Sequence, residues 1–338
     1  MLANKFKIGS YIVSRDSEPF IIAEAGSNFN QDLDIAKKLI DIAKEAGAQA
    51  VKFQLFDAEA LYPDKGEMYE IFKTIQLNKE WVPILNNYSK SKGIIFLASA
   101  FDFSSVDVLD DINVPAFKIA SSETTNLPLL SYIASKKKPL LISTGMCDSI
   151  DVEEAVKISI QNGVKEICLM QCGAQYPLEI ENSNLKVLNY FSDRFTCPIG
   201  LSDHTLGSVQ SITAIGLGAT VFEKHFTFDK SAEGPDHFYA LEPKGLTSYI
   251  SSLKEAHLSL GSYEKEMLQI EREVGRREGL YYSTDLKKGA KLSVDSTYSD
   301  RPAIGVRSRY IHAISHAALR VNVKKGETVR WKHLSFGD

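Results

Sequence analysis

Residues 20–56 read FIIAEAGSNFNQDLDIAKKLIDIAKEAGAQAVKFQLF, and this stretch sets the pattern for most of the chain. An apolar run at 20–28 is followed by a segment at 32–47 in which apolar residues recur at helical spacing. A second apolar run follows at 50–56. This order predicts two parallel strands joined by a crossover helix, with Gly47 at a natural helix end.

The same alternation continues along the chain. Eight apolar runs of strand length lie at 20–28, 50–56, 94–102, 116–123, 139–146, 166–172, 198–205 and 221–229. A doubly wound open sheet would usually carry a glycine-rich dinucleotide turn after its first strand, whereas this first strand ends in Glu24, Gly26 and Asn28. Eight units therefore favour an α/β fold of the closed (β/α)8 TIM-barrel type, with a closing helix at 245–261.

The character of the sequence changes after the barrel. Residues 261–276 are a charged linker, and residues 277–338 contain the short β-type runs GLYYS, KLSV, LRVNV and TVRW. The expected domains are a barrel at 1–260, this linker and a small all-β domain at 277–338. The last segment holds twelve Lys and Arg against six Asp and Glu. Because these basic residues are spread singly and no aromatic platform accompanies them, we expect them to face an acidic surface or an anionic substrate, not nucleic acid.

Composition excludes several other classes of protein. With 44% hydrophobic and 24% charged residues over 338 positions, the chain can bury a full core. No apolar run reaches the roughly 18 residues of a membrane helix, and no secretion signal begins the chain, so a cytoplasmic enzyme is expected. The four cysteines form no CxxC pair, which argues against a zinc ribbon or a disulfide framework.

Polar residues gather at the carboxyl ends of the predicted strands, where TIM barrels hold their active sites. Because residues two apart on a strand face the same way, His204 and His225 would both point into the barrel mouth from the last two strands. Neighbouring strands lie about 4.8 Å apart. Two such imidazoles can bind one divalent cation and leave positions open for substrate. The alternative for each histidine is a hydrogen-bonded core residue.

Two lysines are also expected inside the barrel, Lys52 on the second strand and Lys118 on the fourth. A buried ammonium group is costly unless an anion neutralises it. The hydroxyls of Ser121, Ser143 and Ser202 lie along the same rim, and lysines with hydroxyl donors predict a phosphate ligand.

Glu24 and Glu123 are the candidate acid and base. Proton transfer needs a carboxyl group whose pKa is tuned by burial and by neighbouring charge. The alternative is that either glutamate is the structural ion-pair partner of a lysine.

Taken together, these motifs resemble the sialic acid synthase family, the bacterial nonulosonate synthases that condense phosphoenolpyruvate with N-acetylmannosamine or a related sugar. The resemblance covers nearly the whole chain. It rests on IIAEAGSNFNQD, AVKFQLF, FKIASSETTNLPLL, PLLISTGM, PIGLSDHT and EKHFTFDKSAEGPDHFYALEP, and on the C-terminal RREGLYY, DLKKGA, RPAIG and VKKGETV. It implies a transferase with a TIM barrel followed by an antifreeze-protein-like (SAF, β-clip) domain.

The resemblance also implies roles for individual residues. Phosphoenolpyruvate would be held by Lys52, Lys118, Ser121, Ser143 and Ser202. Glu24 and Glu123 would handle protons, while His204 and His225 match ligands of a divalent metal, with Mn²⁺ expected and Mg²⁺ or Co²⁺ as alternatives. Such an ion would polarise the sugar aldehyde for attack by C3 of phosphoenolpyruvate. The matching sugar-side positions are Asn28, Gln54, Tyr176, Asp236 and Arg301.

Arg301 lies in the C-terminal motif RPAIG, and its match implies a domain-swapped homodimer. Two positions depart from the family pattern. Ala174 stands where many relatives have Asn or Ser, and Ala303 with Ile304 stands where glycine usually follows the arginine motif. The expected acceptor is thus N-acetylmannosamine-like, with a di-N-acyl trideoxyhexose that gives a legionaminic or pseudaminic acid as the alternative. A 3-deoxy-octulosonate-type synthase, a metal-dependent aldolase and a non-catalytic sugar-binding protein are the more distant alternatives.

Overall fold

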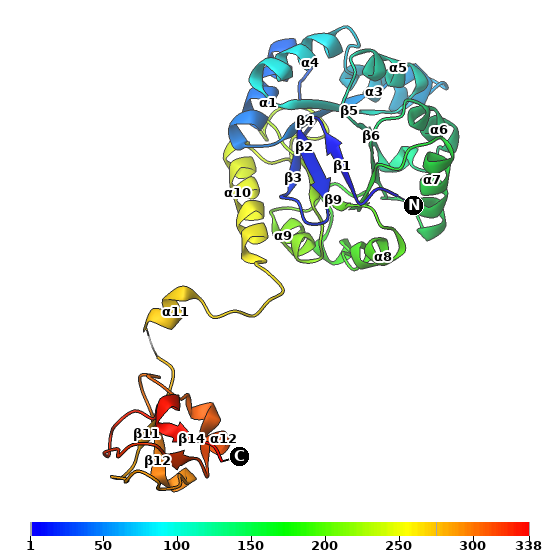
Figure 1. The fold of residues 1–338 in the computed structure, drawn as a ribbon. Coiled ribbons are helices and arrows are strands. Elements are labelled where there is room, and N and C mark those ends of the chain that lie inside the picture. Colours follow the sequence, from blue (N-terminus) through cyan, green and yellow to red (C-terminus); the bar gives the residue numbers. More distant parts are fainter. Residues whose placement is uncertain (1, 275, 338) are drawn as a thin grey trace. The chain divides into compact units, whose positions relative to one another are not determined.

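The computed structural model describes residues 2–274 and 276–337. The chain divides into two compact units, with the boundary between Gly261 and Ser262. The first unit is a ring of helices around a central barrel (Figure 1). Within the described residues, no helix is long and apolar enough to cross a membrane.

Eight parallel strands close the barrel in the order β10-β3-β4-β5-β6-β7-β8-β9. Their bounds are β3 Phe20–Gly26, β4 Ala50–Leu55, β5 Ile95–Ala100, β6 Phe117–Ile119, β7 Leu140–Ser143, β8 Ile167–Cys172, β9 Ile199–Asp203 and β10 Val221–His225. The last strand, β10, pairs with both β9 and β3, and this pairing closes the ring. The TIM-barrel fold predicted from the sequence is confirmed.

Helices cover the outside of the barrel. They are α1 Leu33–Ala46, α2 Ala58–Leu61, α3 Glu67–Ile75, α4 Trp81–Lys92, α5 Phe103–Asp111, α6 Leu127–Ser135, α7 Ser149–Gln161, α8 Val187–Arg194, α9 Val209–Gly216 and α10 Pro243–Ser259. The first shows why they form. Asp32 caps the N-terminus of α1 by accepting hydrogen bonds from the Asp34 and Ile35 amides, and Gly47 ends the helix at a φ of 92°.

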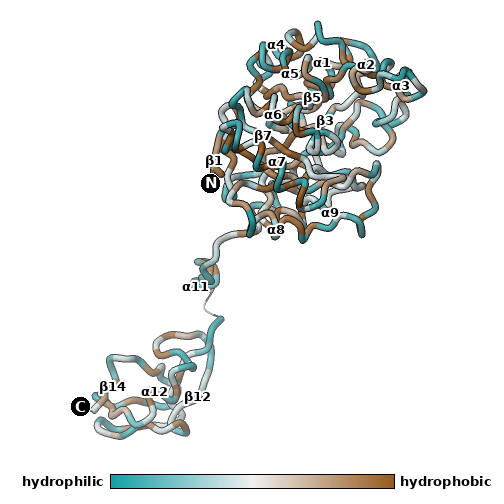
Figure 2. Tube along the Cα trace, turned by 90° about the vertical axis from the view of Figure 1, so that its right-hand side faces the viewer, coloured by the Kyte–Doolittle hydropathy of each residue, from teal (hydrophilic) through white to brown (hydrophobic). Residues whose placement is uncertain are grey.

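The barrel interior is divided into an apolar floor and a polar mouth. A hairpin of β1 Lys5–Ile8 and β2 Tyr11–Ser14 closes the N-terminal end of the barrel (Figure 1), and Phe6, Ile8 and Val13 pack there against inward-facing residues of the strands. The sequence analysis placed the first strand at Phe20 and missed this hairpin. Hydrophobic segments accordingly concentrate in the interior of the first unit, as around β7 (Figure 2).

The predicted strand at 116–123 is too long. Strand β6 ends at Ile119, and Ser121–Glu123 form a turn of 3-10 helix. The hydroxyl of Thr124 bonds to the carbonyl of Ser143, and the amide of Asn126 bonds to the carbonyl of Glu123. Short polar side chains and local backbone bonds compete here with strand pairing, so Glu123 is carried on a turn and not on a strand.

The second unit contains small antiparallel sheets, as expected for an antifreeze-protein-like domain. Strand β11 Gly279–Tyr282 pairs with β12 Thr297–Asp300, and β13 Ala318–Leu319 pairs with β14 Leu334–Ser335. Two predicted β runs are wrong in part, because Val294 begins the 3-10 helix Val294–Ser296 and Trp331 begins the 3-10 helix Trp331–His333. The segment before β11 contains a short helix, α11 Gln269–Val274, and α12 spans Ile311–Ile314.

Candidate active site at the barrel mouth

Four charged side chains lie buried together inside the barrel. The Lys52 Nζ is 2.9 Å from Glu24 Oε2 and 3.7 Å from Glu223 Oε2. The Lys118 Nζ is 3.5 Å from Glu223 Oε1. All four residues are at most 4% exposed. Two ammonium groups are thus matched by two carboxylates, which removes most of the cost of burying any one of them.

Three serine hydroxyls complete this cluster, and each comes from a different strand. Ser99 Oγ accepts from Lys52 Nζ at 2.9 Å, and Ser143 Oγ accepts from Lys118 Nζ at 2.7 Å. Ser202 Oγ donates to Glu223 Oε1 at 3.1 Å. Ser121, on the 3-10 turn after β6, accepts from the amide of Gly145 at 3.0 Å. The predicted lysines and serines therefore do gather at one end of the barrel.

The two carboxylates of the cluster differ in proton affinity. Burial raises the pKa of Glu24 to about 7, because it outweighs the attraction of Lys52 and acts together with the negative charge of Glu223. Burial also disfavours the charged form of Glu223, but Lys118 and Lys52 overcome this effect and hold its pKa at about 2. Glu24 is therefore the carboxyl that exchanges a proton near neutral pH, while Glu223 stays ionised between two ammonium groups.

His204 and His225 face one another beside this cluster, with their ring centres 5.4 Å apart. His204 Nδ1 lies 2.7 Å from the carbonyl oxygen of Gly173, which can only accept, so Nδ1 carries the proton and Nε2 keeps a free lone pair. Tyr239 donates its hydroxyl proton to Asp236 at 2.8 Å, so its oxygen accepts from His225 Nδ1 at 3.4 Å. Both rings thus present Nε2 as a ligand.

The pair fits a divalent cation. An imidazole nitrogen binds such an ion at about 2.1 Å, so two ring centres can lie at most about 6.5 Å apart across one ion, and the observed 5.4 Å is within this limit. Within residues 2–274 and 276–337, no group of three or more His, Cys, Asp and Glu is placed to hold an ion. Further ligands would therefore be water or substrate oxygens.

Protonation of the two histidines differs. Burial lowers the pKa of His225 to about 3, which keeps the ring neutral. Burial acts on His204 in the same direction, but the Cys172 sulfur and the Gly173 carbonyl outweigh it and raise the pKa of that ring. A cation at His204 would therefore compete with a proton.

Aromatic and acidic side chains form the wall beside the histidines. The Tyr176 ring lies 4.2 Å from the ring of His204, and the Tyr239 ring lies 5.2 Å from that of His225. Asp236 accepts from Ser27 Oγ at 3.2 Å as well as from Tyr239. Gly26 has no Cβ atom, and this lets the backbone of β3 approach the Asp236 carboxylate closely. A Cβ at position 26 would lie only 2.7 Å from Asp236 Oδ2.

Several predicted site residues, among them Glu123, Asn28, Gln54 and Arg301, form no hydrogen bond or ion pair with the charged cluster. Glu123 accepts from the Asn126 amide group at 3.2 Å on its own turn. Asn28 is fully buried and donates to the carbonyl of Phe226, with its Oδ1 unpartnered. Gln54 is half-buried and lies two residues after Lys52 on β4, so the two side chains are on the same face of the strand. Arg301 belongs to the second unit, where its guanidinium lies 3.4 Å from Glu278.

The sequence analysis missed three residues that the structure places at the centre of the site. Glu223 lies two residues before His225 on β10 and so faces the same way, but the sequence analysis gave it no role, although it contacts both lysines. Ser99 and Tyr239 were not singled out. The strand alternation that located Lys52 would also have located Ser99, because the two lie on adjacent strands near the carboxyl end. No signal in the sequence identifies Tyr239.

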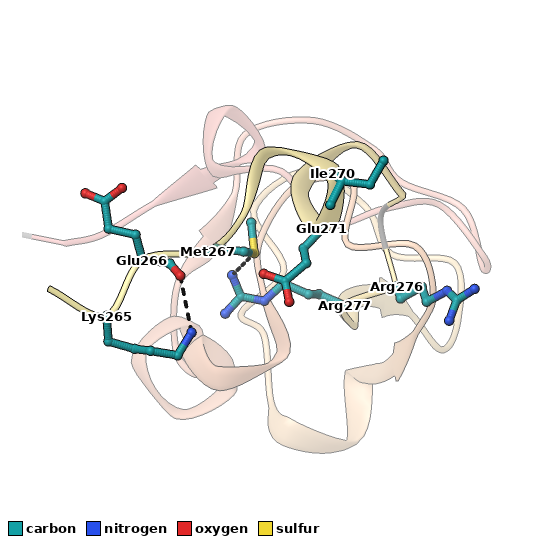
Figure 3. A pocket seen from close by; sticks show the side chains of 7 residues that line it. All are labelled: Lys265, Glu266, Met267, Ile270, Glu271, Arg276 and Arg277. Carbon is teal, nitrogen blue, oxygen red and sulfur yellow. Dashed lines mark hydrogen bonds between the residues drawn. The ribbon is translucent and has the colours of Figure 1, made fainter. Parts of the chain in front are cut away.

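A hollow of about 780 Å³ lies in the second unit and is lined by Lys265, Glu266, Met267, Ile270, Glu271, Arg276 and Arg277 (Figure 3). Its charged groups bind close neighbours in the chain: Lys265 donates to the carbonyl of Glu266, and Glu271 accepts from the amide of Leu268. None of the predicted site residues lines it. The buried charge cluster and the paired imidazoles make the barrel mouth the stronger candidate for chemistry.

Comparison with known proteins agrees with this geometry. The model of the NeuB family matches residues 39–265. The chain is 39% identical over 335 residues to N,N'-diacetyllegionaminic acid synthase of Legionella pneumophila, which covers 93% of this chain and 94% of that protein. It is 36% identical over 292 residues to human N-acetylneuraminate-9-phosphate synthase, with 82% of this chain and 81% of that protein covered.

A solved structure of a related synthetase has the same fold. The crystal structure of N-acetylneuraminic acid synthetase from Leptospira borgpetersenii superposes with a TM-score of 0.76 at 30% identity, and covers 81% of this chain and 95% of that chain. The family model matches more than half of the residues, and relatives above 30% identity cover most of the chain. The chain therefore belongs to the NeuB family of sialic and nonulosonic acid synthases.

Proposed function

We propose that this chain condenses phosphoenolpyruvate with the open-chain aldehyde of an acylamino sugar, and that the products are a nine-carbon 2-keto acid and phosphate. The observation that carries the proposal is the pairing of two arrangements at one end of the barrel. A buried cluster contains Lys52 and Lys118 with their serine partners, and the imidazoles of His204 and His225 face each other beside it.

The lysine cluster supplies the site for an anionic substrate. Lys118 and Lys52 are currently matched by Glu223 and Glu24, so an entering phosphate competes with these carboxylates for the two ammonium groups. Ser143 and Ser121 add hydroxyl groups at the same rim. Charged donors and hydroxyls together suit a phosphate better than a single carboxylate, because a phosphate offers three acceptor oxygens.

The imidazole pair supplies the site for a divalent cation, and we propose Mn²⁺. When bound, such an ion polarises the aldehyde oxygen of the acceptor. Glu24 then holds or releases a proton beside the reacting carbons, and its pKa of about 7 leaves both protonation states populated at neutral pH. The aromatic rings of Tyr176 and Tyr239 exclude water from one side of the imidazoles.

Glu123 is proposed as the second proton-handling group. It lies on the turn after β6 and follows Ser121 by two residues. Its carboxylate accepts a hydrogen bond from the Asn126 side chain, and the residue as a whole is 9% exposed, so the carboxylate would meet a substrate placed over the mouth. Asn28, Gln54, Tyr176 and Asp236 are proposed to contact the sugar.

For the acceptor, we propose a di-N-acyl trideoxyhexose that gives a legionaminic-type product. The relative from Legionella pneumophila is named for a diacetylated product, and its match spans 93% of this chain. Ala174 and Ala303 depart from the family pattern, in which Asn or Ser and glycine are usual, and these departures favour an acceptor other than plain N-acetylmannosamine. N-Acetylmannosamine is the alternative acceptor, and a pseudaminic-type sugar is the second.

We also propose that Arg301 acts in the partner's site within a homodimer. Its guanidinium is largely exposed and contacts only one exposed glutamate, Glu278, among the ion pairs of the described residues. Sedimentation analysis would show a dimer, and mixing of Arg301→Ala with Lys118→Ala chains would restore part of the activity if each site uses both chains.

The central experiment measures phosphate release. The purified protein is incubated with Mn²⁺, phosphoenolpyruvate and one acceptor at a time: a di-N-acyl trideoxyhexose, N-acetylmannosamine, its 6-phosphate and a five-carbon sugar phosphate. Release with an acylamino sugar supports the proposal. Release only with the five-carbon sugar phosphate would favour an octulosonate-type synthase, and no release with any acceptor would reject condensation altogether.

A further inference from the structure

A hollow of about 610 Å³ lies on the carboxyl side of the barrel, between the loop after β3, helix α3 and the loop after β10. Its lining includes Ser27, Gln31, Glu70, Ile71, Glu233 and Pro235. Its volume falls in the range of about 300–1,000 Å³ that is usual for small-molecule sites. No residue that the sequence analysis singled out lines it, so the site described so far leaves this hollow without a role.

The hollow adjoins the histidine side of the active site, and the Asp236 side chain lies between them. Ser27 lines it and donates to Asp236 Oδ2 at 3.2 Å. Asp236 in turn accepts from Tyr239, whose oxygen lies 3.4 Å from His225 Nδ1. A sugar that lies over Asp236 with its aldehyde at the imidazole pair would therefore direct its remote end toward this hollow.

The loop after β10 is fixed by hydrogen bonds of a buried histidine. His237 is buried, and its Nε2 lies 2.8 Å from Asn30 Oδ1 while its Nδ1 lies 2.6 Å from Thr227 Oγ1. Gly234 has a φ of 148°, and a Cβ there would meet the His237 ring at 2.8 Å. The wall formed by residues 233–235 is thus a built surface fixed against the loop after β3, which is what a selective site needs.

The chemistry of the lining is specific. Glu70 and Glu233 provide two carboxylates, and neither forms an ion pair within the part of the chain that the structure describes. Ile71, 43% exposed, and Pro235 provide apolar surface next to them. Among the described residues, no Lys or Arg lines the hollow. A carboxylate accepts the N–H of an amide, and an apolar wall covers its acyl methyl group, whereas a phosphate here would face two like charges.

We infer that this hollow receives the end of the acceptor remote from its aldehyde, and that it selects an uncharged acylamino group there over a phosphate. Glu70 and Glu233 determine specificity by accepting the amide N–H of the acylamino group, and Ile71 packs against its acyl methyl group. The inference rests on the proposed function, because the aldehyde must lie at the imidazole pair for the remote end to reach the hollow.

The test compares kcat/KM ratios between acceptors within each protein, so enzyme concentration and phosphoenolpyruvate binding cancel. The acceptors are a di-N-acyl trideoxyhexose, N-acetylmannosamine and N-acetylmannosamine 6-phosphate, with Mn²⁺ and phosphoenolpyruvate saturating. The variants are E70K/E233K and Ile71→Gln. The matched control is Glu67→Lys, which reverses an exposed charge on the same helix outside the hollow.

In the wild type, we expect the diacylated sugar to be the best acceptor and the 6-phosphate the worst. E70K/E233K should raise the ratio for phosphorylated over unphosphorylated N-acetylmannosamine roughly tenfold, because two repulsive charges become attractive. Ile71→Gln should lower the ratio for diacylated over monoacylated acceptor roughly fivefold, through loss of apolar contact. Glu67→Lys should change neither ratio.

Two different failures are distinguishable. If no acceptor releases phosphate with the wild type, the proposed function is wrong and the inference falls with it. If the wild type turns over these sugars but prefers the 6-phosphate, or if the variants leave both ratios where the control leaves them, the proposed function stands and the inference alone is overturned.

Discussion

Replacing Glu223 by glutamine tests the charge cluster most directly. Glutamine has nearly the same shape and can still accept from Ser202, so the change removes one negative charge and little else. The Glu223 oxygens lie 3.5 Å from Lys118 Nζ and 3.7 Å from Lys52 Nζ. At an effective dielectric constant of about 20, each of these attractions is worth about 5 kcal/mol before desolvation is counted.

The net effect on stability is smaller than this sum. Removing one partner of a buried pair costs about 3–5 kcal/mol, because it leaves an uncompensated charge. Lys52 retains Glu24 at 2.9 Å, but Lys118 then has no carboxylate within 4.0 Å among the described residues. We therefore expect Glu223→Gln to lower the free energy of unfolding at pH 7 by about 3 kcal/mol.

The pH dependence of this loss identifies its cause. Burial already lowers the pKa of Lys118 below 10.5, and loss of Glu223 lowers it further. A lysine whose pKa is lower in the folded than in the unfolded protein destabilises the fold at neutral pH, and this penalty shrinks as pH rises toward 10.5. The destabilisation by Glu223→Gln should thus be larger at pH 7 than at pH 9.5.

The assay is urea denaturation followed by tryptophan fluorescence, at both pH values and with or without inorganic phosphate. Phosphate should restore part of the stability of Glu223→Gln, because it binds the freed ammonium groups. The control is Glu153→Gln, which breaks a shorter but exposed pair with Arg194 at 2.8 Å and should change stability little. If Glu223→Gln behaves like this control, or is insensitive to pH, the cluster does not hold its lysines charged as argued.

Further predictions concern the cation and the barrel floor. His204→Ala should abolish binding of Mn²⁺ by the purified protein, measured by metal analysis after dialysis, whereas His312→Ala, an exposed histidine of the second unit, should leave it unchanged. Because the pKa of His204 is raised and a cation must displace its proton, the apparent affinity for Mn²⁺ should fall about tenfold per pH unit below that pKa, as calorimetry would show. A flat affinity would mean that His204 is not a ligand. Arg15→Ala should lower the free energy of unfolding by about 2–3 kcal/mol, because Arg15 donates to the carbonyls of Ser192, Phe195 and Cys197 and so fixes the hairpin that closes the barrel. An unchanged melting temperature would show that the hairpin is held by its apolar contacts alone.

The charge balance of the site has a consequence for substrate binding. With two ammonium groups and two carboxylates, the empty cluster is close to neutral when Glu24 is ionised. Burial raises the pKa of Glu24 to about 7, so protonation of this residue leaves a net positive charge where a phosphate would bind. The same group that could transfer a proton thus also tunes the affinity of the site for an anion.

The sequence by itself determined the barrel fold and which face of a strand most of the site side chains occupy. Strand–helix alternation and the two-residue period of a strand are local properties, so they placed Lys52, Lys118, Ser202, His204 and His225 on inward faces near the carboxyl ends. The structure bears out these positions. The motifs along the chain also indicate the family to which it belongs.

Only the tertiary structure decided which of these side chains meet. Closure of the ring sets β10 beside β3, with His225 opposite Glu24 in the strand register, and this brings Glu223 between lysines of β4 and β6. The N-terminal hairpin that forms the floor and the turn that carries Glu123 also depend on contacts between distant segments. Partner choice across a closed barrel is non-local, because it is set by strand register and ring closure, and periodicity along one chain carries no information about either.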